Sequence, residues 1–284
     1  MFISIKLSRA IFIILLFTCF LFFCSAGVTG VFFDKEEEGI SLPILMYHHI
    51  LKDKSKHGAY VISPDEFEAD LIYLKENGYT TITIADLINL TQDNILLPEK
   101  PVMITFDDGY LSTLEYAYPL LEKYNMKAVI SVIAKYSEEY SQNHDRHVPY
   151  AHLTWEDLSF MQKSGVFEVQ NHTYDMHKNI SGARHGSKRV SGESLEHYEA
   201  EFKKDVSLAQ DLLFKNSGIN ATCFTYPFGM ISDESIDFVR DMGFSASLSC
   251  FEGINYITEN PDSLYLLKRY NRAHNRHAKK ILEK

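Results

Sequence analysis

Residues 102–109 read VMITFDDG, an apolar run that leads directly into two carboxylates and a glycine. Such a run predicts a buried strand of a parallel sheet. In a barrel of alternating strands and helices, the strand ends open onto the active face, so Asp107 and Asp108 are expected there. An Asp-Gly pair also marks turns. Adjacent acids at a buried strand end oppose each other's ionisation, however, and a cation beside them would remove that penalty. The stretch therefore favours a functional site.

Similar runs alternate with helical patterns along the chain. Strands are expected at 43–47, 80–84, 102–106, 128–134, 166–170, 222–226, 244–248 and 264–267, and helices near 64–77, 85–92, 112–124, 155–164, 194–216 and 233–242. Ser63, followed by Pro64 and Glu66, has the residues of a capping box at a helix start. The alternation predicts an α/β fold with a parallel sheet covered by helices. About eight strands favour a distorted (β/α) barrel of about seven to eight strands.

The front of the chain has a different composition from the rest. Lys6 and Arg9 precede an uncharged run, 10–33, that is long enough for a spanning helix and allows cleavage after Ala26. The sequence predicts a signal peptide or a membrane anchor at 1–33, and both would export the remainder. An acidic linker at 34–41, a single domain at 42–275 and a C-terminal tail at 276–284 are expected to follow.

Composition excludes several classes of protein. The 284 residues are 45% hydrophobic and 23% charged, which is typical of a globular protein. A net charge of −10 argues against nucleic acid as a partner. After the apolar run only Cys223 and Cys250 remain. They could form one disulfide in an oxidising compartment, although two separate buried thiols are favoured.

Histidines follow two other strand-like runs. His172 and His177 are five residues apart, so they do not share one face of a regular helix, but a turn can bring both rings to one ion. Two histidines and a carboxylate with an open fourth position form a catalytic zinc site. His48 and His49 end the first run, and imidazole is a natural proton donor near neutral pH. For His49, a hydrogen-bonded core position is favoured.

Two further segments are candidates for a site. Residues 173–192 show no periodic pattern and carry five basic side chains, so this loop either contacts substrate or is simply solvated. The strand-like run at 222–226 ends in a sharp Pro-Phe-Gly turn at 227–229, whose backbone N–H groups could line a site.

Together these motifs resemble the polysaccharide deacetylase family, the NodB homology domain. TFDDG at 105–109 matches the first motif of that family, and HTYDMH at 172–177 is similar to its metal-binding motif, with the histidines five rather than four residues apart. This longer spacing, with YHHI at 47–50, resembles the branch of extracellular poly-N-acetylglucosamine deacetylases. The resemblance covers roughly residues 42–272.

The resemblance implies a base and a metal site. Asp107 would be the catalytic base. A divalent metal, most simply Zn²⁺ with Co²⁺ or Ni²⁺ as alternatives, would be bound by Asp108, His172 and His177.

It also implies an acid and an oxyanion donor. His48 would be the general acid, and the N–H of Phe228 would help bind the oxyanion. The family's usual Leu-x-His motif and the arginine before the proline are not evident here. Arg269 or Arg272 could supply a charge near Asp107.

The sequence thus predicts a metal-dependent N-deacetylase that acts outside the cell on an N-acetylglucosamine polymer and releases acetate. An O-acetyl esterase acting on a polysaccharide is one alternative, and a non-catalytic carbohydrate-binding domain at the cell surface is another. A glycosidase with two carboxylates would leave His172 and His177 without a role. The membrane would be a partner if the first segment stays uncleaved.

Overall fold

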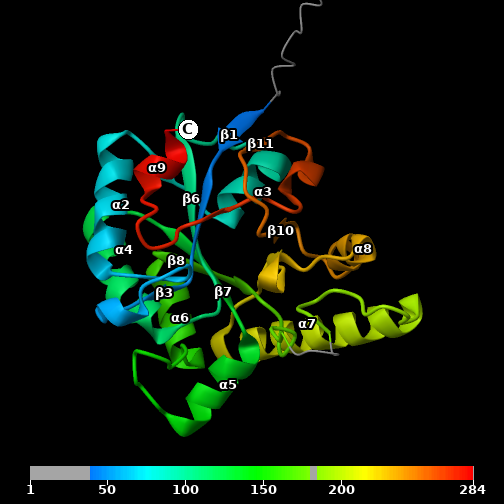
Figure 1. Ribbon diagram of the computed structural model, residues 1–284. Coiled ribbons are helices and arrows are strands. Elements are labelled where there is room, and N and C mark those ends of the chain that lie inside the picture. The colour runs from blue at the N-terminus through cyan, green and yellow to red at the C-terminus, as the bar shows by residue number, and fades with distance from the viewer. Residues whose placement is uncertain (1–38, 180–183, 284) are drawn as a thin grey trace, which may run out of the picture. The chain divides into compact units, whose positions relative to one another are not determined.

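The computed structural model describes residues 39–179 and 184–283, and the expected signal or anchor segment lies outside them. Within these ranges no helix combines the length and apolar character that a membrane crossing requires. Eight of the strands in the described part of the chain form a parallel sheet in the order β10-β9-β8-β7-β6-β2-β12, with β5 paired to β6 (Figure 1). The predicted α/β class and strand number are confirmed.

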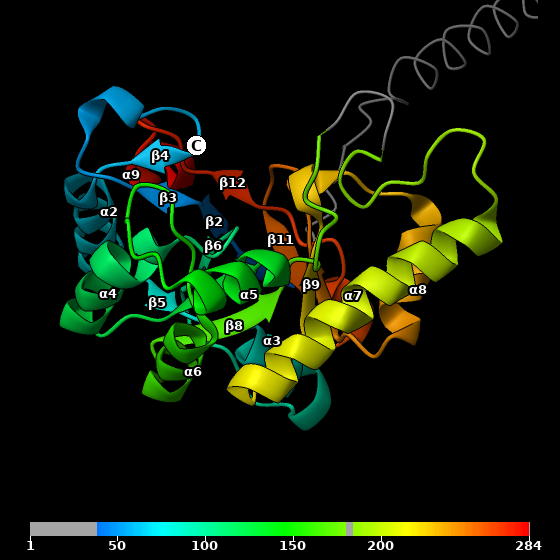
Figure 2. The same cartoon turned by 90° about the horizontal axis from the view of Figure 1, so that it is seen from below.

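The elements have the following bounds. The main sheet contains β2 (Ile44–Tyr47), β5 (Thr80–Thr81), β6 (Pro101–Phe106), β7 (Ala128–Val132), β8 (Phe167–Asn171), β9 (Cys223–Thr225), β10 (Ala246–Leu248) and β12 (Tyr270–Asn271). Two small pairs are β1 (Ile40–Leu42) with β11 (Asn255–Ile257), and β3 (His49–Ile50) with β4 (Val61–Ile62). The α-helices are α2 (Pro64–Glu76), α3 (Ile84–Asp93), α4 (Tyr118–Tyr124), α5 (Ala134–Asn143), α6 (Trp155–Ser164), α7 (Leu195–Ser217), α8 (Asp233–Asp241) and α9 (Ala278–Leu282). Figure 2 shows α2, α4, α6, α7 and α8 arranged around the strands.

The segment from Leu267 to Arg272 closes the curled sheet into a distorted barrel. At its start, Leu267 makes a parallel bridge with Leu248 of β10. At its end, β12 pairs with β2, and the Arg272 N–H donates to the carbonyl of Met46 at 2.9 Å. One short segment therefore bonds to both edges of the sheet, and the residues between its two ends lie in the gap.

Alternation along the strands separates two cores. Side chains such as Leu45 and Ile104 pack outward against helices α2, α4 and α6, whereas Ile44 and Met103 point into the barrel, where α3 covers them. Strand β6 is buried along its whole length, as expected of a central parallel strand with both faces covered. A third cluster lies between α7, α8 and strand β9.

Three local expectations need correction. The predicted strand at 264–267 is wrong, because Pro261–Leu264 is a 3₁₀ turn and the strand lies later, at β12. Leu264 and Leu267 are both buried. Buried leucines in an irregular segment give the same apolar pattern as a buried strand, so periodicity cannot distinguish the two. The predicted strand 128–134 ends at Val132. Helix α5, which follows it, was not predicted because its sequence is mostly polar and only Ala134 and Ser137 are buried.

The ends of the expected domain also carry regular structure. Ile40 and Ser41, placed in the acidic linker, belong to strand β1, and the expected tail contains helix α9. The capping box at Ser63 is present, with the Glu66 N–H donating to the Ser63 hydroxyl at 3.1 Å. Cys223 and Cys250 are both free thiols.

Candidate metal and catalytic site

The carboxyl ends of the parallel strands bring the sequence motifs together. His48 follows β2, the two aspartates follow β6, His172 follows β8 and the Pro-Phe-Gly turn follows β9. Their side chains line one cavity of about 520 Å³. A larger cavity of about 750 Å³ lies near the amino ends of β5, β7 and β8, but none of these motifs reaches it. The chemistry is therefore concentrated at one end of the barrel.

Asp108, His172 and His177 converge on one point. Asp108 Oδ1 lies 3.6 Å from His172 Nε2 and 3.2 Å from His177 Nε2, and all three ligand atoms lie within 4.8 Å of one another. Ligand atoms around a tetrahedral zinc are about 3.4 Å apart, given bonds of about 2.0–2.2 Å. The five-residue spacing of the histidines is compatible with this because Thr173, at φ 72°, turns the chain between them.

The metal-ligand atoms of these residues are available to bind a cation. Asp108 Oδ1 is buried and has no hydrogen-bond partner among the described residues, which is costly unless a positive group lies beside it. The His172 Nδ1–H donates to the carbonyl of Thr225 at 2.8 Å, which leaves the Nε2 lone pair facing the site. The three residues therefore fit a divalent metal ion.

Burial controls the protonation of these ligands. It lowers the pKa of His172 to about 3 and also lowers the pKa of His177, so both imidazoles stay neutral and can coordinate. Burial raises the pKa of Asp108 to about 6. A bound cation would oppose that rise, because it favours the carboxylate.

Asp107 forms a buried ion pair with Arg269. The two guanidinium nitrogens lie 2.7 and 2.8 Å from the two carboxylate oxygens, a bidentate arrangement. Burial alone would raise the pKa of Asp107, but the Arg269 charge and its hydrogen bonds hold that pKa well below its usual range. Asp107 is therefore ionised beside the cation ligands and can accept a proton only transiently.

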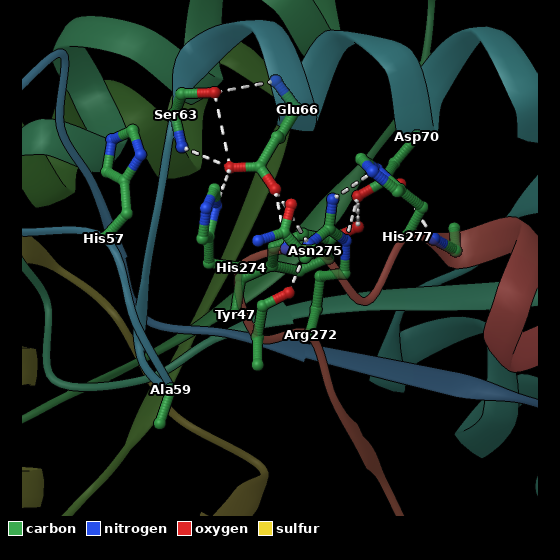
Figure 3. A network of polar contacts seen from close by, with 12 residues as sticks. Tyr47, His57, Ala59, Ser63, Glu66, Asp70, Arg272, His274, Asn275 and His277 are labelled. Carbon is green, nitrogen blue, oxygen red and sulfur yellow. Dashed lines mark hydrogen bonds and ion pairs between the residues drawn. The ribbon is translucent and has the colours of Figure 1, made fainter. Parts of the chain in front are cut away.

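Arg272, the other candidate for this charge, points elsewhere (Figure 3). Its Nε donates to Asp70 of helix α2 at 2.6 Å, and Tyr47 donates to the same oxygen at 3.0 Å. The other oxygen of Asp70 accepts the Ala278 N–H at the start of α9, at 2.8 Å. This buried network anchors the closing segment to α2, and Arg269 extends from that segment to Asp107.

His48 and His49 have different environments. The His49 ring bonds to the Ser112 hydroxyl at 2.6 Å and to the Pro149 carbonyl at 3.1 Å, so it is the hydrogen-bonded core histidine. His48 lines the cavity, and within residues 39–179 and 184–283 its buried Nδ1 has no hydrogen-bond partner. Burial lowers the pKa of His48, although Asp107 and Asp108 oppose that shift.

The Pro-Phe-Gly turn presents Phe228 to the cavity. Phe228 has φ 55°, an uncommon conformation for a residue with a side chain, and the turn is held by the N–H groups of Gly229 and Met230. The Phe228 ring lies 4.1 Å from the ring of His177. The Phe228 side chain thus lies next to one of the metal ligands.

Several residues of the cavity could not be predicted from the sequence. Tyr60, Cys250 and Asn271 line the cavity but belong to no recognisable motif. His152 is buried, and its Nδ1 lies 3.0 Å from the carbonyl oxygen of Asp108. Only the fold brings these residues to the strand ends.

The basic side chains of the 173–192 loop are largely paired. Arg184 bonds to Glu193, Arg189 to Glu234, and Lys178 to Asp175 at 2.5 Å. These pairs neutralise much of the positive charge that the sequence suggested for this loop.

Comparisons with known proteins agree with this geometry. The family model of polysaccharide deacetylases matches residues 96–247. YxkH of Bacillus subtilis strain 168, named provisionally as a polysaccharide deacetylase, is 31% identical over 220 residues, which cover 77% of this chain and 68% of that protein. The poly-β-1,6-N-acetyl-D-glucosamine N-deacetylase of Staphylococcus aureus strain MRSA252 is 27% identical over 208 residues, or 73% of this chain and 66% of that protein. The chain thus spans about two thirds of the length of these relatives.

A solved structure is also similar. IcaB from Ammonifex degensii superposes with a TM-score of 0.67 and 28% sequence identity, covering 82% of this chain and 92% of that one.

Proposed function

Because the chain belongs to the polysaccharide deacetylase family of hydrolases, we propose that it removes N-acetyl groups from an extracellular N-acetylglucosamine polymer. The observation that carries this proposal is the convergence of Asp108, His172 and His177 beside the ion-paired Asp107 in one cavity. The uncharged run at 10–33 supports export of the catalytic domain, either secreted or anchored. The N-deacetylase from Staphylococcus aureus supports the choice of polymer.

The residues divide the work of amide hydrolysis. A divalent cation on the three ligands, most simply Zn²⁺, would supply Lewis-acid chemistry and make water acidic enough to react near neutral pH. Asp107 accepts a proton as water attacks the acetyl carbon. The Phe228 N–H donates a hydrogen bond to the oxyanion, and a donor of this kind contributes about 3–4 kcal/mol.

His48 completes the reaction at the leaving group. When the carbon–nitrogen bond breaks, the sugar nitrogen takes a proton from His48 and leaves as an amine, with acetate as the other product. An amide anion would be far too basic to depart, so this proton is needed. The proton that Asp107 received restores His48 through solvent, which balances the cycle.

The test is acetate release from β-1,6-linked N-acetylglucosamine oligomers, with and without a chelator. We expect release that stops on chelation and returns with added Zn²⁺. Acetylated xylan in parallel distinguishes ester from amide hydrolysis. Turnover that survives complete metal removal would contradict the mechanism.

The variant Asp107→Asn distinguishes the role of Asp107 from that of Asp108. This variant should lose turnover while it still binds metal, because Asp107 is not among the three ligands. Loss of the metal in this variant would mean that Asp107, rather than Asp108, is the ligand.

A further inference from the structure

An exposed aromatic ring lines the cavity beside His48. The Tyr60 side chain is 59% exposed, and its ring centroid lies 4.8 Å from that of His48. Phe228, 41% exposed, lies against His177 instead. A large exposed ring beside a polar catalytic cavity is typical of a surface that binds a ligand.

The loop that carries Tyr60 is fixed by the closing segment of the barrel. The Gly58 carbonyl accepts the His274 N–H at 2.9 Å, and the Ala59 carbonyl accepts the Asn271 amide at 3.0 Å. The Tyr60 carbonyl in turn accepts the N–H of His49 at 3.1 Å. Three consecutive carbonyls are therefore held while the ring stays exposed, so the ring is presented in advance of binding.

His274 connects this loop to helix α2. Its Nδ1 lies 2.9 Å from Glu66 Oε2, and Figure 3 shows this contact below the first turn of the helix. Glu66 is the third residue of α2 and completes its capping box with Ser63, so the loop is held against the start of this helix.

Asn271 adds an unused acceptor to the same wall of the cavity. Its Nδ2 must face the Ala59 carbonyl, and this sets the orientation of the amide. Its Oδ1 is buried and has no hydrogen-bond partner in the part of the chain that the structure describes. A buried acceptor of this kind gains most from a donor supplied by a bound molecule.

We propose that Tyr60 and Asn271 form a subsite for one sugar unit of the polymer, with the pyranose ring stacked on Tyr60 and a hydroxyl donating to Asn271 Oδ1. A pyranose combines an apolar face of C–H groups with a rim of hydroxyl donors, which matches one aromatic ring next to one acceptor. The net charge of −10 suits a neutral glycan better than an acidic one. The subsite rests on the proposed function and specifies where the substrate binds.

Kinetics on two acetylated substrates test this subsite. Tyr60→Ala is compared with the wild type on a β-1,6-linked N-acetylglucosamine pentamer and on 4-nitrophenyl acetate, which has no sugar. We expect KM for the pentamer to rise about tenfold, equivalent to ~1.4 kcal/mol, and to rise far more than KM for the small ester. Tyr60→Phe should behave as wild type, because it keeps the ring. Phe214→Ala, which removes an exposed ring on α7, is the matched control.

The outcomes separate the subsite from the proposed function. An unchanged pentamer KM in Tyr60→Ala, or an equal loss on the small ester, would overturn the subsite. If the wild type releases no acetate from the pentamer, the proposed function fails. Calorimetric titration with the pentamer then decides the subsite alone, with weaker binding by Tyr60→Ala supporting it and equal binding overturning it.

Discussion

Replacing Arg269 with methionine is expected to leave Asp107 as a buried carboxylate without a counter-charge. The Arg269 and Asp107 side chains are 0% and 3% exposed, and they share two hydrogen bonds of 2.7 and 2.8 Å. Breaking a buried pair by removing one partner costs about 3–5 kcal/mol. We expect Arg269→Met to lose about 3 kcal/mol of unfolding free energy near neutral pH, since Asp107 can limit the cost by taking up a proton.

The loss should depend on pH with a definite sign. In the wild type the pKa of folded Asp107 lies below its unfolded value of about 3.9, so the carboxylate contributes stability above pH ~4 that is lost at lower pH. Without Arg269, burial raises the folded pKa above the unfolded one, and stability falls as the pH rises. The difference between wild type and variant should therefore widen from pH 4 to pH 8.

Urea denaturation at several pH values measures this difference. The double variant with Asp107→Asn should lose at least ~2 kcal/mol less than the sum of the single variants, because it removes both charges. Arg276→Met is the control, because its pair with Glu252 is partly exposed and should be worth less than ~1 kcal/mol. A loss below ~1 kcal/mol for Arg269→Met, or one that does not change with pH, would refute the buried-pair reasoning.

Three further perturbations test other parts of the site. His177→Ala removes a direct ligand and should weaken zinc binding by more than about 100-fold in equilibrium dialysis; an unchanged zinc content would exclude His177 as a ligand. His48→Asn should lower kcat for acetate release by roughly 10²–10⁴-fold with KM little changed, and an unchanged kcat would assign the acid elsewhere. Burial alone would raise the pKa of Glu66, but hydrogen bonds from His274, Asn275 and Ser63 lower it to about 2. The Glu66 carboxylate therefore stabilises the fold above pH ~4.5, and this contribution is lost as the pH falls toward 2. Glu66→Gln should therefore cost ~1–2 kcal/mol at pH 7 and less at pH 3, whereas an equal cost at both pH values would contradict a charge effect.

Much of the fold could be predicted from local patterns. The alternation of apolar runs and capped helices indicates a parallel sheet, because each pattern reports burial on one face of its own element. Helix α5 escaped this reasoning because only Ala134 and Ser137 are buried, so its sequence has no apolar face to detect. The strand expected at 264–267 failed for the opposite reason, since Leu264 and Leu267 are buried without forming a regular strand.

The end of the barrel that carries the chemistry could be predicted from the sequence alone. Asp107, Asp108 and His172 each follow a strand directly, and parallel strands place all their carboxyl ends on one face, so no knowledge of packing was needed. The identity of the arginine that pairs with Asp107, in contrast, depends on tertiary packing. Arg269 and Arg272 are three residues apart on the segment between β10 and β2, and nothing local distinguishes them. The choice depends on how that segment crosses the gap, which directs one guanidinium into the barrel and the other to Asp70.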